Sequence, residues 1–212
     1  MTTHPHILGA ILAGGAARRM FPDRGGDKGL NELGGVAMLS HVIERLRPQV
    51  GQLILNANGD PARFAAFGLD VVPDVLGPDQ GPLAGLYAVM DWAGRQEMSF
   101  DKILTVSTDV PFLPPGLVDK LAAAIRSQRP VIAQSSGRLH PAIGLWPVSL
   151  KDAVAQALAE GRRGFEGFAT ANEAIAVGFP FSDIAGETVD PFFNVNTPDD
   201  LAAARRLLAG QT

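Results

Sequence analysis

The sequence predicts an α/β fold of three layers, with helices on both faces of a Rossmann-like, mostly parallel sheet. Two observations predict it. Short apolar runs alternate with amphipathic stretches along most of the chain, which is the pattern of βαβ units. Polar or glycine-rich segments directly follow several of the apolar runs, and in such folds ligands bind beyond the carboxyl ends of the strands.

Five apolar runs in the first two thirds of the chain predict strands. They are Ile7–Leu12, Leu53–Asn56, Asp70–Pro73, Ile103–Ser107 and Val131–Gln134. The stretches between them have the spacing of amphipathic helices. These are Met38–Leu46, Pro61–Phe67, Leu83–Ala93 and Pro115–Ile125.

The alternation of apolar runs and amphipathic stretches becomes less regular after Gln134. Arg138–Trp146 is predicted as a strand, and Pro141 restricts its pairing to an edge or a bulge. A helix at Val148–Leu158, a Gly/Arg loop at Gly161–Gly164 and a strand at Ala174–Phe179 follow. The last helix, Asp199–Leu208, has Thr197 as an N-cap and Pro198 in its first turn. No repeat or linker is present, so residues 1–212 are expected to form one domain.

Composition excludes several classes of function. The formal net charge of −4 argues against a nucleic-acid binder. The chain has no cysteine, so disulfides, thiolate metal sites and thiolate nucleophiles are excluded. No apolar stretch is long enough to span a membrane, and the N-terminus has no secretory signal. We therefore expect a cytoplasmic protein that binds neither membrane nor nucleic acid.

The segment from Leu12 to Lys28 carries the strongest functional signal. It follows the first predicted strand, and Gly14 and Gly15 let the backbone lie close against a ligand. Four cations follow the glycines: Arg18, Arg19, Arg24 and Lys28. Exposed N–H groups with clustered cations suit a polyphosphate, whereas a simple turn with solvated side chains is the alternative. Neither the Walker fingerprint nor the dinucleotide-binding fingerprint is present.

The same segment resembles the signature L-A-G-G-x-x-x-R-M, followed by a lysine, of nucleotidyltransferases of the nucleotide-sugar pyrophosphorylase superfamily. Within that superfamily, the chain resembles the molybdenum cofactor guanylyltransferases from about Ile7 to Leu207. Further stretches carry the resemblance: Asp27-Lys28-Gly29, Asn56-Ala57-Asn58, Gly81-Pro82-Leu83-Ala84-Gly85, Asp109, His140-Pro141 and Asn194-Val195-Asn196-Thr197-Pro198.

The resemblance implies a sheet with one antiparallel strand in the C-terminal half. It also implies that the N-terminal half binds nucleotide and the C-terminal half binds a pterin substrate. The implied reaction transfers GMP from GTP to the phosphate of molybdopterin, with Mg²⁺ as cofactor and pyrophosphate as the second product. Transient contacts with molybdenum-insertion proteins and recipient apoenzymes are implied as well, and we expect a monomer.

Three residues receive catalytic roles from the resemblance. Lys28 contacts the triphosphate, and Arg19 contacts the departing pyrophosphate. Asp109 follows an apolar strand and is assigned to Mg²⁺, which favours one or two carboxylates plus substrate phosphates. An ordinary helix-capping or turn aspartate is the alternative for Asp109.

The predicted GTP contacts lie after the strands or at a helix start. They are Leu12, Ala13, Gly14, Gly15, Lys28, Asn56, Asp74, Gly81, Pro82 and Asp109. Asn56 and Asp74 match guanine-binding positions, but such residues after strands also shape turns. Gly81 and Pro82 open a helix against the nucleoside, or merely cap it.

The pterin contacts implied by the resemblance are His140, Asn194 and Asn196, and one of the two asparagines is also expected near the metal. A structural histidine is the alternative for His140. Arg162 and Arg163 either reach the acceptor phosphate or belong to a solvated loop. The chain departs from the family at Phe21–Gly26, an insertion that is longer than expected.

Three other functions compete with the guanylyltransferase. A cytidylyltransferase acting on the same pterin would share the first motif, and a sugar-phosphate nucleotidyltransferase is disfavoured by the Asn-Val-Asn-Thr-Pro motif. A module that binds GTP and pterin without chemistry could lose Lys28 or Asp109. The chain keeps both residues, which favours catalysis.

Overall fold

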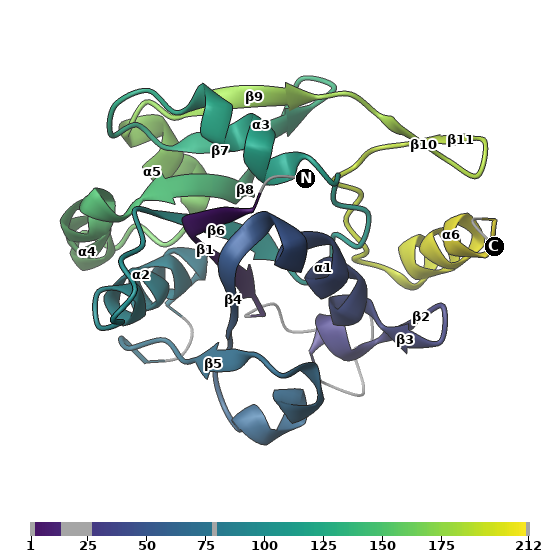
Figure 1. The fold of residues 1–212 in the computed structure, drawn as a ribbon, viewed down its shortest axis with the longest axis horizontal. Helices are drawn as coiled ribbons and strands as arrows, with labels where there is room; N and C mark the ends of the chain where they lie inside the picture. The colour runs from purple at the N-terminus through teal and green to yellow at the C-terminus, as the bar shows by residue number, and fades with distance from the viewer. Residues whose placement is uncertain (1–2, 14–26, 78–79, 211–212) are drawn as a thin grey trace.

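The computed structural model describes residues 3–13, 27–77 and 80–210. Its main sheet has seven strands in the order β5-β4-β1-β6-β8-β7-β9 (Figure 1). Their bounds are β1 His4–Leu12, β4 Val50–Asn56, β5 Asp70–Val72, β6 Lys102–Ser107, β7 Val131–Ser135, β8 Arg138–Pro147 and β9 Ile175–Phe179. Only β8 runs antiparallel to its neighbours within this sheet. The predicted fold class is confirmed, including the single antiparallel strand in the second half.

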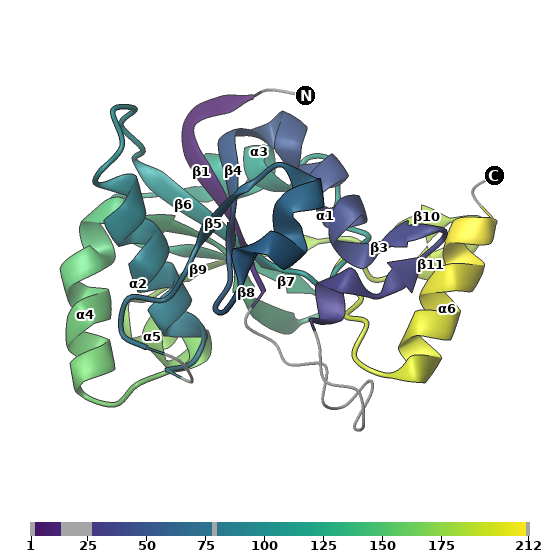
Figure 2. The ribbon, with the colours of Figure 1, turned by 90° about the horizontal axis from the view of Figure 1, so that it is seen from below.

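Side chains of the strands alternate between two hydrophobic cores, one on each face of the sheet. In β1, Ile7 and Ile11 pack toward α1 (Met38–Leu46), α3 (Leu117–Ala124) and the 3₁₀ helix η4 (Pro61–Phe67). Leu8, Ala10 and Leu12 pack toward α2 (Pro82–Ala93), α4 (Lys151–Ala159) and α5 (Phe165–Ala171). Figure 2 shows these two groups of helices on opposite sides of the sheet. The period-2 geometry of a strand therefore produces the three layers.

Strand β8 lies inside the sheet, between β6 and β7. Ile132 of β7 pairs with Gly144, but the next residue, Ala133, pairs with His140. Residues 141–143 therefore form a bulge. Pro141 lies in this bulge, where its missing N–H is not required by the ladder. Of the two predicted placements for Pro141, the structure has the bulge and not the edge.

A small lobe lies at one end of the sheet, where α6 (Pro198–Ala209) packs against two short hairpins (Figure 1). The hairpins are β2 (Glu32–Leu33) with β3 (Val36–Ala37) and β10 (Ser182–Ile184) with β11 (Glu187–Val189). Helix α6 begins as predicted, because the Thr197 side chain accepts from the N–H of Asp200 in a capping box. The hairpins were not predicted, since strands of two or three residues are too short to show alternation.

The remaining differences concern helices. The predicted helix Pro61–Phe67 is a 3₁₀ helix, and the predicted helix Val148–Leu158 is a 3₁₀ turn, η5 (Val148–Leu150), followed by α4. Helix α5 was not predicted. Two further 3₁₀ turns are η2 (Lys28–Leu30) and η3 (Arg47–Gln49). None of the helices in the three described ranges has the length and apolar character of a membrane span.

Candidate active site

The carboxyl ends of four parallel strands form one row. Leu12 of β1 is level with Asn56 of β4 and with Ser107 of β6, and Asn56 is level with Val72 of β5. Residues just beyond this row project from a single edge of the sheet. Ala13, Asn58, Asp74 and Asp109 are all found there, which brings together four segments far apart in the sequence.

A lysine and a carboxylate meet at the β6 end of this edge. Lys28 Nζ donates to Asp109 Oδ2 at 3.2 Å, and it also donates to Asn196 Oδ1. The other carboxylate oxygen, Asp109 Oδ1, accepts from Ser107 Oγ at 2.6 Å. The two charged side chains are each 11% exposed. The cluster therefore combines a cation, an anion and an amide in a largely desolvated place.

Backbone contacts hold this cluster from two sides. Gly29, next to Lys28, is packed so closely on the segment after β6 that a Cβ would lie 2.9 Å from Thr108 Cβ. The Val195 N–H donates to the Asp109 carbonyl at 2.8 Å, which fixes the segment that carries Asn196. Asp200 in α6 accepts from the N–H of Asn196 at 3.0 Å. Asn196, and not Asn194, is thus the asparagine beside Asp109; Asn194 is exposed.

A second polar cluster lies at the ends of β4 and β5. Asn56 Nδ2 donates to Asp74 Oδ1 at 3.0 Å and to the carbonyl of Val72 at 3.0 Å. Asn58 Nδ2 donates to Asp74 Oδ2 at 2.8 Å, and its own Oδ1 accepts from the Asp74 N–H at 2.8 Å. Two amides thus hold both oxygens of one carboxylate. Asn56 and Asp74, which were each matched to guanine-binding positions, are thus hydrogen-bonded to each other, whereas their contact with guanine stays a prediction.

Helix α2 begins beside this cluster. Gly81 is its N-cap with φ +79°, a conformation that glycine favours, and Pro82 is in the first turn. The Leu83 N–H donates to the Arg163 carbonyl at 3.1 Å, so the loop at Gly161–Gly164 covers one of the free donors of the helix. Arg163 itself donates to the carbonyl of Leu158 at 2.6 Å. Arg163 thus has partners within the protein, and its contact with the acceptor phosphate stays a prediction.

His140 belongs to a third cluster, at the carboxyl end of β7. Its Nε2 lies 2.7 Å from Ser135 Oγ, and Ser135 Oγ donates to Asp190 Oδ2 at 2.8 Å. The imidazole also packs on Phe192, with ring centroids 4.9 Å apart. Burial lowers the pKa of His140 from its ordinary value of 6.5; Asp190 opposes this change and Arg138 adds to it. These contacts favour a structural role for His140. The contact of His140 with pterin stays a prediction.

Part of the predicted phosphate loop lies outside the described residues. This part contains Gly14, Gly15, Arg18, Arg19, Arg24 and the insertion Phe21–Gly26. Leu12 and Ala13 are described: the Ala13 N–H donates to the Asn56 carbonyl at 2.8 Å, which extends the sheet beyond β1. Lys28 follows the undescribed stretch and already lies at Asp109.

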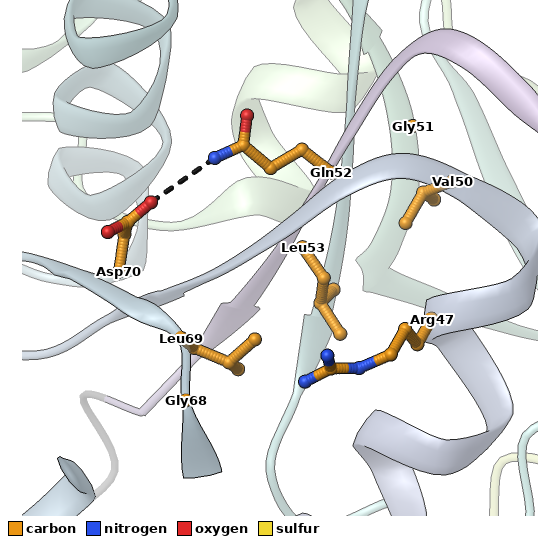
Figure 3. A pocket seen from close by; sticks show the side chains of 8 residues that line it. All are labelled: Arg47, Val50, Gly51, Gln52, Leu53, Gly68, Leu69 and Asp70. Atoms are coloured by element: carbon orange, nitrogen blue, oxygen red, sulfur yellow. Dashed lines mark hydrogen bonds between the residues drawn. The ribbon is translucent and has the colours of Figure 1, made fainter.

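A pocket of about 430 Å³ lies elsewhere, beside the amino-terminal halves of β4 and β5. In Figure 3 the side chains of Leu53, Leu69 and Arg47 surround it, and Gln52 donates to Asp70 at its rim. None of the predicted site residues within the described ranges lines it. Because substrates of parallel sheets bind at the opposite ends of the strands, we do not assign this pocket to the reaction.

Comparison with known proteins agrees with this geometry. The family described as the MobA-like NTP transferase domain matches residues 9–174, which contain the second half of β1, the Lys28 segment, the strands from β4 to β8 and Asp109. The chain belongs to this family. The molybdenum cofactor guanylyltransferase of Bradyrhizobium sp. (strain ORS 278) is 44% identical over 98% of this chain and 96% of that protein.

Two solved structures share the fold. The molybdopterin-guanine dinucleotide biosynthesis protein A of Archaeoglobus fulgidus has a TM-score of 0.71 and 20% identity, over 95% of this chain and 98% of that chain. A Mycobacterium tuberculosis protein solved in complex with manganese has a TM-score of 0.64 and 16% identity, over the same shares of the two chains. The MobA-like fold therefore covers almost the whole molecule, including the lobe around α6.

Several residues of this MobA-like site were missed by sequence reasoning. Ser107 supports Asp109, Asn58 supports Asp74, and Arg63 donates to Asp27. The patterns Ser-x-Asp and Asn-x-Asn at strand ends were available signals, because alternate residues of an extended segment point the same way. Arg63, Ser135 and Asp190 gave no signal, since their contacts join segments distant in sequence.

Proposed function

We propose that the protein transfers GMP from GTP to the terminal phosphate of molybdopterin, with or without molybdenum bound, and releases pyrophosphate. The observation that carries the proposal is the cluster of Lys28, Asp109 and Asn196 at the carboxyl edge of a MobA-like sheet. The name of the Bradyrhizobium relative, which is similar over nearly its whole length, supports the choice of GTP and of the molybdenum cofactor.

The reaction needs no covalent intermediate on the protein. An oxygen of the molybdopterin phosphate is already anionic and attacks the α-phosphorus of GTP in line. A new O–P bond forms as the bond from the α-phosphorus to the bridging oxygen breaks, and the electron pair leaves with pyrophosphate. Positioning and charge stabilisation supply most of the catalysis in such transfers. The absence of cysteine is compatible with this chemistry.

Lys28 is the proposed donor to the triphosphate. Its ammonium is anchored near Asp109 and Asn196, and a preorganised cation in a dry site stabilises charge that develops on the α-phosphate. We propose that Arg19 contacts the leaving pyrophosphate and that the backbone of Leu12, Ala13, Gly14 and Gly15 lies along the phosphates. These roles follow from the family signature.

Asp109 fits the metal that this reaction requires. Its Oδ2 already accepts from an ammonium, so the carboxylate is oriented toward a cation in a largely desolvated place. Among the described residues, no three acidic or histidine side chains form a ready-made metal cage. Magnesium suits such a site, since it binds through one or two carboxylates together with substrate phosphates. We propose that Asp109 holds Mg²⁺, which would neutralise charge on the phosphates.

The base and the pterin are proposed to bind on opposite halves of this edge. Asp74 would accept from the N1–H and the exocyclic amine of guanine, with Asn56 beside it and Gly81 and Pro82 against the nucleoside. His140, Asn194 and Asn196 would face the pterin. The residues proposed for the base belong to the N-terminal half of the chain, and those proposed for the pterin belong to the C-terminal half. We propose that this single domain acts as a cytoplasmic monomer and delivers its product through transient contacts.

Release of pyrophosphate with Mg²⁺ and molybdopterin tests the proposal, with GTP compared against CTP, ATP and UTP. Release with GTP alone is expected. Release with CTP instead would keep the mechanism and change the base to cytosine. Binding of GTP without release of pyrophosphate under any condition would favour a non-catalytic module.

A further inference from the structure

The guanidinium of Arg63 joins two segments of the candidate active site. Arg63 lies on η4, on the face of the sheet covered by α1. Its Nε donates to Asp27 Oδ2 at 2.6 Å, and its Nη2 donates to the carbonyl of Asn58. Its Nη1 donates to the carbonyl of Asp60. One side chain therefore holds two chain segments, at Asp27 and at residues 58–60, through three different nitrogens.

The contacts of Arg63 with Asp27 and Asn58 connect it to the residues proposed to bind the phosphates and the base. Asp27 immediately precedes Lys28, whose Nζ lies at Asp109. Asn58 binds both the side chain and the backbone of Asp74. Arg63 thus lies between the residue proposed to bind the triphosphate and the residue proposed to bind the base.

The surroundings of the Arg63 side chain suit the planar guanidinium of arginine better than the ammonium of lysine. The guanidinium carbon lies 4.4 Å from the centroid of the Phe64 ring, so the planar group stacks on the aromatic face. Gly59 has φ +82°, and a Cβ there would lie 3.4 Å from Arg63 Nη1. Lysine carries a point charge and lacks the planar fork, so it cannot reproduce three diverging hydrogen bonds.

The same contacts argue against a direct role in binding phosphate. Nε, Nη1 and Nη2 all donate to the protein itself, and the side chain is 30% exposed. An arginine that binds a phosphate directly needs part of its fork free. Arg63 therefore acts through Asp27 and Asn58.

We infer that Arg63 is a positioning residue that fixes the distance between Lys28 and Asp74, so that a guanine nucleotide engages both when its α-phosphate is aligned for attack. The inference rests on the proposed function and adds a residue to it. A misplacement of about 1 Å costs about a hundredfold in rate for a reaction that depends on alignment. We call the contacts of Arg63 with Asp27 and Asn58 the brace. Its loss should therefore reduce turnover more than it reduces GTP affinity.

The test compares Arg63→Lys, Asp27→Asn and their combination with the wild-type protein. Each single variant is expected to lower kcat about tenfold to a hundredfold, with a smaller change in the KM for GTP. The double variant should be no slower than the slower single variant, because both changes break one contact. Asp27→Asn keeps the contacts of Arg63 to Asn58 and Asp60, which provides a milder variant should Arg63→Lys fold poorly.

Arg47→Lys is the matched control. Arg47 is on η3 and also donates to a backbone carbonyl, that of Phe67, but it lies beside the pocket at the other end of β4. The kcat of the Arg47→Lys variant should remain at the wild-type value. Wild-type kinetics in the Arg63 and Asp27 variants, or independent effects that multiply in the double variant, would overturn the inference.

Failure of the inference is distinguishable from failure of the proposed function. If the wild-type protein releases no pyrophosphate with any nucleotide, the proposed reaction is wrong, and the brace is then tested by titration with GTP and with guanosine. A brace between the base and phosphate ligands predicts that Arg63→Lys weakens GTP binding and leaves guanosine binding unchanged. Equal losses for both ligands, or no loss for GTP, would contradict it.

Discussion

Lys28 Nζ lies 3.2 Å from Asp109 Oδ2, although 81 positions separate the two residues in the chain. The contact joins the segment behind the phosphate loop to the end of β6, and Asn196 brings in the C-terminal segment at the same nitrogen. Desolvated ion pairs gain little net stability, because both charges lose water. We infer that this pair is retained for the reaction: it holds a cation at the place where phosphate charge would develop.

Asp109→Asn should abolish most turnover while leaving the fold intact. The amide keeps the size of the side chain but removes the charge proposed to hold Mg²⁺. We expect kcat to fall about a hundredfold to a thousandfold, as it does when one preorganised electrostatic group is removed. Asp101→Asn is the control, since Asp101 is exposed and immediately precedes β6 at the opposite edge. Pyrophosphate release measures both, and unchanged turnover in Asp109→Asn would remove Asp109 from the mechanism.

Asp74→Asn should weaken GTP binding. Both carboxylate oxygens of Asp74 accept hydrogen bonds from the amides of Asn56 and Asn58, and guanine would offer two more donors. An amide presents only one acceptor oxygen, so at least one contact is lost, at a cost of about 1–3 kcal/mol. This corresponds to about a tenfold to hundredfold higher Kd.

Titration with GTP measures the effect at Asp74, and Asp70→Asn is the control. Asp70 begins the same strand, β5, and its carboxylate accepts from Gln52 Nε2, at the end of the strands away from the candidate active site. Equal affinities for GTP in wild type and Asp74→Asn would exclude Asp74 from base recognition.

Strand ends could be predicted from the sequence because they depend on local pattern. Buried apolar runs identified β1, β4, β5, β6 and β7 to within a few residues, and Asp74 and Asp109 follow β5 and β6 as expected, while their roles stay predictions. The family resemblance, and not the spacing, assigned Lys28 and Asp109 to one site, and their direct contact was not predicted.

The residues that brace the site could not be predicted in this way. Arg63 contacts Asp27 across 36 positions, and Ser135 contacts Asp190 across 55. Neither pair leaves a periodic signal in one sequence, because the contact is created by the tertiary fold. The short hairpins beside α6 were missed for a related reason: tertiary packing and not intrinsic alternation stabilises them.

Gly85→Ala should destabilise the protein and weaken GTP binding together. Helix α2 approaches β4 so closely at Gly85 that a Cβ would overlap Asn56 Oδ1. Asn56 is buried and holds Asp74, so it has little room to move. We expect a loss of about 1–3 kcal/mol in the free energy of unfolding, typical of overpacking.

Urea unfolding and GTP titration measure these two effects of Gly85→Ala. Gly94→Ala, at the end of the same helix, is the control: its φ is −68°, and a Cβ there would meet atoms no closer than 3.7 Å. We expect its stability to change by no more than about 0.5 kcal/mol. A Gly85→Ala protein as stable as Gly94→Ala would show that α2 can move away from β4 at little cost.

The stability of the protein should decrease as the pH is lowered, because of His140. Burial lowers the pKa of His140 below its ordinary value of 6.5, an effect that Asp190 opposes and Arg138 increases. The unfolded chain therefore binds the proton more tightly than the folded protein does. Above pH 6.5 both states are neutral at this residue, and nothing is lost. As the pH falls below 6.5 and through the lowered pKa, protonation favours the unfolded state and stability is lost.

His140→Gln should remove this contribution, because glutamine does not titrate and keeps polar atoms near Ser135 Oγ, the present partner of His140. The free energy of unfolding in urea is measured for both proteins at intervals between pH 8 and pH 5. The difference between wild type and variant should be constant above pH 6.5. Below it, the wild-type protein should lose stability faster. Parallel curves over the whole range would mean that folding does not change the proton affinity of His140, and a faster loss in the variant would mean that Asp190 outweighs burial.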